Sequence, residues 1–140
     1  MGCADRGFQG LPVKYLLDTH TFLWAAVEPR KLSSKAVAAL EEPDADLLLS
    51  AASLWEIGIL QSLQRIQLKL GIAEIAELAV TRLRSELTAI EPEHIDRMRS
   101  LPFHHRDPFD RLLIGQALHL KAAVIGKDPW FDAYGVSRIW

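Results

Sequence analysis

Short apolar runs alternate with segments of helical periodicity along this 140-residue chain, and this alternation constrains the fold most strongly. Runs at residues 13–17, 46–50 and 122–126 have the nearly continuous apolar pattern of strands that are buried on both faces. Residues 87–90 and 136–140 are two further predicted strands. Because strands that alternate with helices pair in parallel, the pattern predicts an α/β fold with helices on both faces of the sheet.

Helices are predicted between these strands from apolar spacing and from capping signals. A helix after Pro92 is expected to turn Ile95 and Met98 toward the core, and residues 64–70 are ambiguous, in keeping with a short extended link. The other predicted helices cover residues 22–26, the segment between Ser33 and Pro43, residues 51–63, residues 72–83 and the segment that follows Pro108.

The length of the chain indicates one domain, which we place at residues 13–140. Residues 1–12 show no periodicity and contain three glycines, so we interpret them as a disordered leader or an extension from an upstream start site. The single cysteine, Cys3, excludes an intrachain disulfide framework and suits a reducing compartment, so we expect a cytoplasmic protein. No apolar run is long enough for a membrane span. A net charge of −2 argues against nucleic-acid binding by the charge of the whole molecule.

Two carboxylates stand at the beginning of the helix that follows Pro108. Asp107 precedes a proline that suits the first helical position, so it can cap the helix by accepting hydrogen bonds from its first N–H groups. Asp110 falls on the first turn, where folding alone does not explain it. Its alternative role is a surface ion pair with Arg106 or Arg111, which would contribute little.

Four acids are expected at one edge of the predicted sheet, because sites in parallel sheets form beyond the carboxyl ends of the strands. Asp18 follows the first strand, Glu56 lies early in the next helix, Asp110 opens the helix before the fourth strand, and Asp128 follows that strand. Taken singly, Asp18 could be a helix cap, Glu56 an exposed helix residue and Asp128 a turn residue. Together they would repel one another unless a cation compensated them.

Oxygen ligands without thiolates suit Mg²⁺ or Mn²⁺. Such an acidic cage can hydrolyse phosphodiesters, since a metal lowers the pKa of a bound water and neutralises charge at the phosphorus.

Histidines and tryptophans are further candidates for functional residues. His104 and His105 are interpreted as loop residues, with RNA contact as a lesser alternative, and His20 is open between substrate contact and packing. Base stacking is possible for Trp24, Trp55 and Trp130, but their apolar neighbours favour core packing.

The chain resembles the PIN-domain ribonucleases, and among them the VapC-type toxins of bacterial toxin–antitoxin pairs. The motif that carries most weight is Asp107-Pro-Phe-Asp110-Arg-Leu-Leu-Ile, and the resemblance runs from residue 13 to residue 140. The supporting motifs are Tyr15-Leu-Leu-Asp18-Thr-His20, Ser53-Leu-Trp-Glu56-Ile and Asp128-Pro-Trp-Phe-Asp-Ala-Tyr-Gly-Val136.

The resemblance implies a three-layer α/β/α sandwich around a mostly parallel five-stranded sheet. It also implies an endoribonuclease dependent on Mg²⁺ or Mn²⁺, with Asp18, Glu56, Asp110 and Asp128 as catalytic and metal-binding residues. We expect Asp18 and Asp110 to be the most direct ligands, and Glu56 and Asp128 to complete the cage or to orient the attacking water. The implied partners are RNA as the substrate, a second copy of the chain in a homodimer, and a cognate antitoxin, with which the chain would form a toxin–antitoxin hetero-oligomer.

One position departs from the pattern of the family. Relatives usually carry Thr or Ser two residues before the last acid, where this chain has Gly126. A glycine has no hydroxyl to hold a metal-bound water, which bears on the role of Asp128. The alternatives to the enzyme are a catalytically degenerate PIN-type module that binds RNA or a protein partner and, less favoured, a phosphatase or receiver-like protein in which Asp18 is the acceptor and Lys127 lies at the sheet edge.

Overall fold

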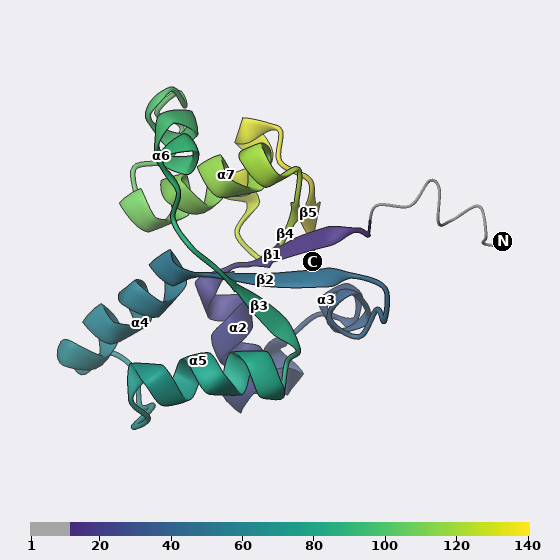
Figure 1. Ribbon diagram of the computed structural model, residues 1–140, viewed down its shortest axis with the longest axis vertical. Helices are drawn as coiled ribbons and strands as arrows, with labels where there is room; N and C mark the ends of the chain where they lie inside the picture. The colour runs from purple at the N-terminus through teal and green to yellow at the C-terminus, as the bar shows by residue number, and fades with distance from the viewer. Residues whose placement is uncertain (1–11) are drawn as a thin grey trace, which may run out of the picture.

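A computed structural model describes residues 12–140 and shows a parallel five-stranded sheet between two layers of helices (Figure 1). The strand order is β3-β2-β1-β4-β5, so the first strand lies at the centre, and all neighbouring pairs are parallel. The predicted α/β/α fold is therefore confirmed. The predicted leader lies outside the described residues, apart from Pro12. The strands are β1 (Lys14–Leu17), β2 (Asp46–Ser50), β3 (Ser85–Thr88), β4 (Ala123–Ile125) and β5 (Arg138–Ile139).

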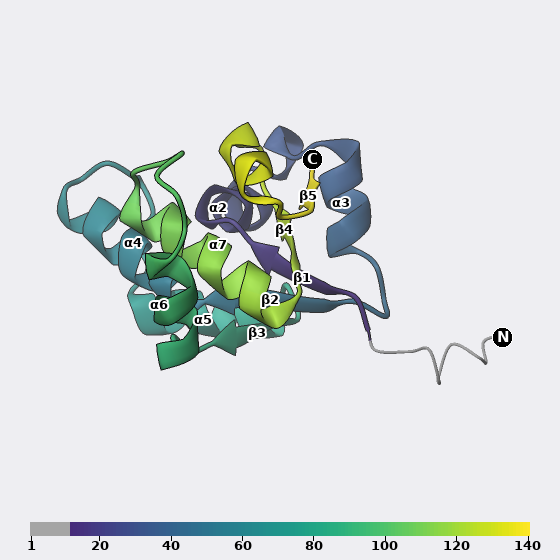
Figure 2. The ribbon, with the colours of Figure 1, turned by 90° about the horizontal axis from the view of Figure 1, so that it is seen from above.

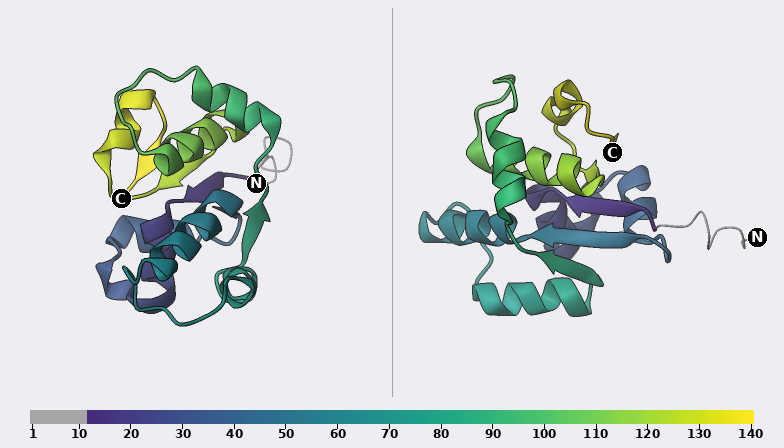
Figure 3. Two further views of the ribbon diagram at one scale, coloured as in Figure 1. Left: turned by 90° about the vertical axis from the view of Figure 1, so that its left-hand side faces the viewer. Right: turned by 45° about the horizontal axis from the view of Figure 1, so that its top comes forward.

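The helices divide between the two faces of the sheet (Figures 1 and 3). One face carries α6 and α7, and the other carries α2, α4 and α5, with α3 packed beside them. Their bounds are α2 (Thr19–Val27), α3 (Ser34–Leu40), α4 (Ala51–Ser62), α5 (Ile72–Thr81), α6 (Pro92–Arg99) and α7 (Pro108–Leu120), with short 3₁₀ helices η1 (Pro29–Lys31) and η2 (Pro129–Tyr134). No helix within residues 12–140 has the length and apolar character needed to cross a membrane.

Side chains of the central strands alternate between two cores, as the two-residue period of a strand requires. Leu16 and Val124 are fully buried on one face, where they pack with Ile114 of α7. Leu17 and Ile125 are fully buried on the other face, against α2, α4 and α5. Burial of each such side chain contributes roughly 1.5–3 kcal/mol, so both helical layers are anchored to β1 and β4.

The third strand lies two residues earlier than the sequence predicts, at Ser85–Thr88 instead of 87–90. Ser85 is buried opposite Leu47 of β2, and its hydroxyl donates a hydrogen bond of 2.7 Å to the carbonyl of Ala79. Leu87, on which the prediction relied, is 41% exposed because β3 is an edge strand. Strand β3 thus begins at a buried serine whose hydroxyl is hydrogen-bonded. The apolar run in the sequence did not predict where the strand begins and ends.

Helix α6 also differs from its predicted orientation. Ile95 is 47% exposed, whereas His94 is buried and faces α7 together with Met98. The reason is a close crossing at Gly115 of α7, where a β-carbon would lie 2.8 Å from the carbonyl oxygen of His94 and 2.9 Å from the nitrogen of Met98. The backbones of α6 and α7 are therefore in close contact at this crossing. Gly115 makes the contact possible, and the contact determines which face of α6 is buried.

Candidate metal centre

The four acids predicted from the sequence lie at the carboxyl ends of the strands. Asp18 follows β1 directly, Glu56 lies in α4 after β2, Asp110 lies in the first turn of α7, and Asp128 follows β4. Helix α4 and the beginning of α7 lie at this end of the sheet, away from the end where β1 begins (Figure 2). The topology therefore gathers residues that are far apart in the sequence, as expected for an open parallel sheet.

Asp18 is the most deeply buried of these acids, with 7% of its surface exposed. Its backbone N–H donates to the carbonyl of Ile125 at 3.0 Å, which joins the end of β1 to β4. Asp18 is the N-cap residue of α2, but its side chain forms no capping hydrogen bond there. Burial, and after it the charges of Asp110, Glu56 and Asp128, raise the pKa of Asp18 to about 7.

Glu56 and Asp110 share this electrostatic environment. Burial raises the pKa of Glu56, the Thr19 hydroxyl lowers it, and the charge of Asp110 raises it. Burial also raises the pKa of Asp110, while a hydrogen bond with His105 lowers it. The Thr19 hydroxyl lies 2.9 Å from that of Ser53, which ties the beginning of α2 to α4. Mutual repulsion of this kind is what a bound cation would relieve.

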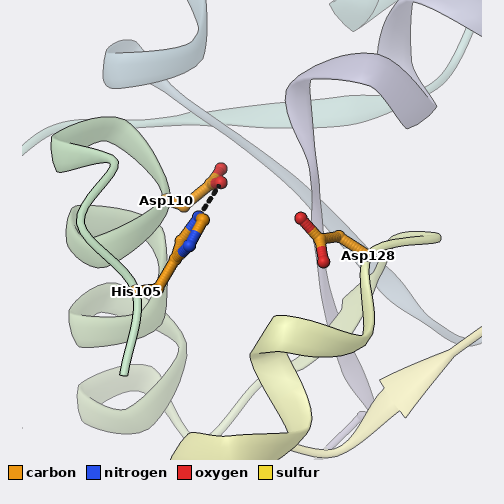
Figure 4. A group of neighbouring side chains, drawn as sticks. All are labelled: His105, Asp110 and Asp128. Carbon is orange, nitrogen blue, oxygen red and sulfur yellow. Dashed lines mark hydrogen bonds and ion pairs between the residues drawn. The ribbon is translucent and has the colours of Figure 1, made fainter. Parts of the chain in front are cut away.

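His105 completes a compact group with Asp110 and Asp128 (Figure 4). One potential ligand atom from each of the three lies within 4.8 Å of the others, and His105 Nε2 is 2.7 Å from Asp110 Oδ2. Figure 4 shows the carboxyl of Asp128 facing this pair from the loop before η2. His105 is in a loop, as the sequence predicts, but its role in the acidic cluster was missed. Its position five residues before Asp110 gives no helical or strand signal.

Buried Arg111 fixes the loop that carries His105 and does not pair with Asp110. Its guanidinium is 4.1 Å from the ring centre of Phe103. The Tyr134 hydroxyl donates to the carbonyl of Pro102 at 2.9 Å and accepts from the N–H of His105 at 2.8 Å. The carbonyls that accept from Arg111 belong to Met98, Leu101, Pro102 and His105, at 2.9–3.4 Å. Arg111 therefore does not form the surface ion pair that was considered for Asp110. It is buried, and it holds the loop before α7 in place by hydrogen bonds to the backbone.

Two acids form caps at the edge of the cluster. Asp107 Oδ1 accepts from the N–H groups of Phe109 at 2.8 Å and Asp110 at 3.1 Å, so its predicted capping role is confirmed. Asp128 Oδ1 accepts from the N–H of Trp130 at 3.0 Å, in keeping with a turn residue. The cap uses one oxygen of Asp128, and its carboxyl still faces Asp110.

The loop that bears Asp128 is held from below by Arg138 of β5. The Arg138 guanidinium donates to the carbonyls of Gly126 at 3.2 Å and Lys127 at 3.3 Å. It also forms two hydrogen bonds with the carboxylate of Asp132, at 2.9 and 3.1 Å. Gly126 packs closely on the site, since a β-carbon there would lie 3.1 Å from Cβ of Asp18. The glycine thus allows β4 and the Asp18 side chain to approach each other.

Two of the tryptophans are exposed, contrary to the prediction that they pack in the core. Trp55 is 64% exposed and Trp130 is 48% exposed, although both stand in apolar stretches of sequence. Trp24 is half-buried, with its ring centre 5.7 Å from that of Trp140. Apolar neighbours in the sequence therefore predicted the environment of Trp24 better than that of the other two.

The donor set of the cluster fits a hard divalent cation. The carboxylates of Asp110 and Asp128 converge with the imidazole of His105, Asp18 and Glu56 interact with Asp110 through their charges, and the described residues contribute no thiolate. Carboxylate oxygens suit Mg²⁺ and Mn²⁺, and burial of several acids together is unfavourable unless positive charge balances them. The residues present therefore fit a divalent metal centre with the chemistry to act on a phosphate ester.

Comparison with known proteins agrees with the motifs and the geometry. Residues 15–136 match the PIN domain family. Ribonuclease VapC22 from Mycobacterium tuberculosis is 31% identical over 114 residues, which cover 81% of this chain and 85% of the relative.

Solved structures share the fold at low sequence identity. VapBC2 from Rickettsia felis, bound to a DNA fragment from its promoter, matches with a TM-score of 0.64 at 13% identity, covering 90% of this chain and 97% of the other. VapBC-1 from nontypeable Haemophilus influenzae matches with a TM-score of 0.60 at 15% identity, covering 90% and 96%. FitAcB from Neisseria gonorrhoeae gives a TM-score of 0.56 at 19% identity, covering 89% and 95%.

Proposed function

The chain belongs to the PIN domain family, and we propose that it is a VapC-type toxin: an endoribonuclease that uses Mg²⁺ or Mn²⁺ to cleave RNA. The name of its relative, Ribonuclease VapC22, supports the reaction class. The observation that carries the proposal is the burial of Asp18 among three other acids, which raises its pKa to about 7. Carboxylates that are gathered at the carboxyl edge of the sheet repel one another, and a bound cation would balance their charge.

We assign the direct metal contacts to Asp18 and Asp110. Glu56 and Asp128 complete the cage or orient the attacking water. A bound divalent cation supplies two effects, namely a lower pKa for water and neutralisation of the charge that builds on the phosphate. Hydrolysis joins the water oxygen to phosphorus and breaks the bond to a ribose oxygen, which leaves as a hydroxyl. Asp107 keeps its structural role as the cap that fixes the first turn of α7.

We propose three kinds of partner for this cytoplasmic toxin: RNA, a second copy of the chain and an antitoxin. Two of the structural neighbours are VapBC proteins, which supports an antitoxin partner. An arginine of the antitoxin that reached the cluster would form charge-assisted hydrogen bonds with its carboxylates. The same contact would exclude both the cation and the RNA.

The test combines purified full-length protein with total cellular RNA in Mg²⁺, in Mn²⁺ or in EDTA. Asp18→Asn is the inactive variant, because it removes a carboxylate while keeping the shape of the side chain. Asp96→Asn is the matched control, since Asp96 forms an exposed pair with Arg99 on α6. We expect discrete cleavage by the parent and by the control with metal, and no cleavage in EDTA or by the Asp18 variant.

Either of two results would contradict the proposal. Cleavage that survives both EDTA and the Asp18 substitution would point to a contaminating nuclease or to another site. RNA binding without cleavage at any metal concentration would support the degenerate binding module instead. In that case Gly126→Ser, which adds the hydroxyl that relatives carry, is the first variant to examine.

A further inference from the structure

We propose that Trp55 and Trp130 are stacking platforms for unpaired RNA bases on the two sides of the acidic cluster. This inference rests on the proposed function, because it names the part of the substrate that the same site receives.

Both indoles stand next to acids of the site. Trp55 precedes Glu56 in α4, and Trp130 follows Asp128 by two residues and donates its backbone N–H to that carboxylate. They belong to α4, which follows β2, and to η2, which follows β4, and these two strands flank β1. A phosphate at the acids would therefore have an exposed aromatic ring within reach on either side.

Each indole is supported by a second aromatic ring. The ring centres of Trp55 and Phe109 are 5.4 Å apart at an angle of 72°, an edge-to-face contact. The ring of Trp130 is stacked with that of His105, with centres 5.3 Å apart at 19°. His105 is in turn fixed by hydrogen bonds to Asp110 and Tyr134. Because the rings are already held in place, little side-chain freedom is lost when a base binds.

The charge of the molecule favours stacking as a source of RNA affinity. The net charge is −2, and the centre of the site is a group of carboxylates that repel phosphate until a cation binds. Stacking of a base on an aromatic side chain contributes roughly 1–3 kcal/mol and does not depend on charge or on base identity. Two exposed indoles can therefore supply binding that the electrostatics of this chain do not.

Stacking of this kind selects unpaired nucleotides. In a duplex each base face is covered by its neighbours, and an A-form helix presents only its grooves and backbone to a protein. In a loop or a single strand the faces are free to lie against an indole. The exposed tryptophans therefore discriminate against duplex RNA without reading its sequence.

Binding is measured in the Asp18→Asn background, so that the RNA is not cut. The probes are a fluorescein-labelled RNA of about 12 nucleotides without self-complementarity, in the range of single-strand site sizes, and the blunt-ended duplex that this strand forms with its complement. The variants are Trp55→Leu and Trp130→Leu, with Trp55→Phe and Trp130→Phe as matched controls that keep an aromatic ring. Thermal unfolding verifies that each variant is folded.

We expect each leucine variant to bind the single strand about 5- to 150-fold more weakly, which corresponds to roughly 1–3 kcal/mol. The phenylalanine variants should retain most of the affinity. They should also lose part of the quenching of tryptophan fluorescence that the single strand produces, which would locate the base on the ring. The duplex should bind weakly, and its affinity should not change with any of the four substitutions.

The stacking proposal is overturned if the leucine variants bind the single strand as tightly as their parent. It is also overturned if they change the self-association of the protein in sedimentation while RNA affinity persists, because the indoles would then belong to a protein interface. Wild-type cleavage assays separate the two levels of inference. If the wild type cuts RNA and the leucine variants bind normally, only the stacking role fails. If the wild type neither cuts nor binds RNA, the proposed function fails with it.

Discussion

The substitution Asp18→Asn is expected to stabilise the metal-free protein increasingly as the pH rises. In the native state the pKa of Asp18 is about 7, compared with 3.8 for an unperturbed aspartate, which approximates the unfolded chain. A group whose pKa is raised on folding contributes stability below the unfolded value and loses it as the pH rises through the native value. Asparagine is neutral throughout, so the variant is spared this loss.

The magnitude follows from the two pKa values. Between pH 5 and pH 8 the unfolding equilibrium shifts by about a hundredfold toward the unfolded state, which is about 3 kcal/mol at 1.36 kcal/mol per tenfold change. Glu56 and Asp110, whose pKa values are also raised, act in the same direction. The stability of the Asp18 variant relative to the wild type should therefore increase by about 3 kcal/mol over this range.

Urea unfolding at pH 5 and at pH 8, with EDTA present, measures this difference. Asp96→Asn is again the control, because Asp96 is exposed and its variant should track the wild type at both pH values. Adding Mg²⁺ at pH 8 should stabilise the wild type and leave the Asp18 variant nearly unchanged. A stability difference between variant and wild type that stays constant from pH 5 to pH 8 would refute the reasoning.

Three further substitutions test the framework around the site. Asp107→Ala removes the cap of α7 and should lower the free energy of unfolding by about 1 kcal/mol in urea, whereas an unchanged value would mean that the cap is dispensable. Gly115→Ala places a β-carbon against the backbone of α6 and should destabilise by about 1–3 kcal/mol, with a drop in melting temperature as the readout. Arg111→Met leaves four backbone carbonyls without their hydrogen-bond donor and should lower the free energy of unfolding by about 2–5 kcal/mol. Full stability and full cleavage activity in this variant would contradict the role of Arg111 in holding the loop.

The sheet and the positions of the acids could be predicted because they depend on local patterns. Buried parallel strands are read from short apolar runs, and an acid directly after such a strand must lie at the carboxyl edge. The cap at Asp107 was equally local, since Pro108 marks the first turn of α7. These features need no knowledge of which segments meet in space.

Features that depend on tertiary contacts could not be predicted. His105 contacts Asp110 because Arg111 and Tyr134 hold the preceding loop against the beginning of α7. The path of that loop produces no periodic pattern in the sequence. Ile95 was expected in the core, but the backbone contact at Gly115 turns it outward. Trp55 is likewise exposed, with its ring against that of Phe109 at the beginning of α7 and not in the core.

The central place of β1 has a consequence for the synthesis of the chain. The first strand must wait for β4, which is synthesised after β2, β3 and the helices between them, before its second edge is paired. A nascent chain that ends after α6 carries Asp18 and Glu56 but neither Asp110 nor Asp128. Because Asp128 follows β4, the group of four acids cannot be complete before β4 has been made. For the ribonuclease proposed above, a chain that has not reached α7 would lack two of the four acids assigned to the site.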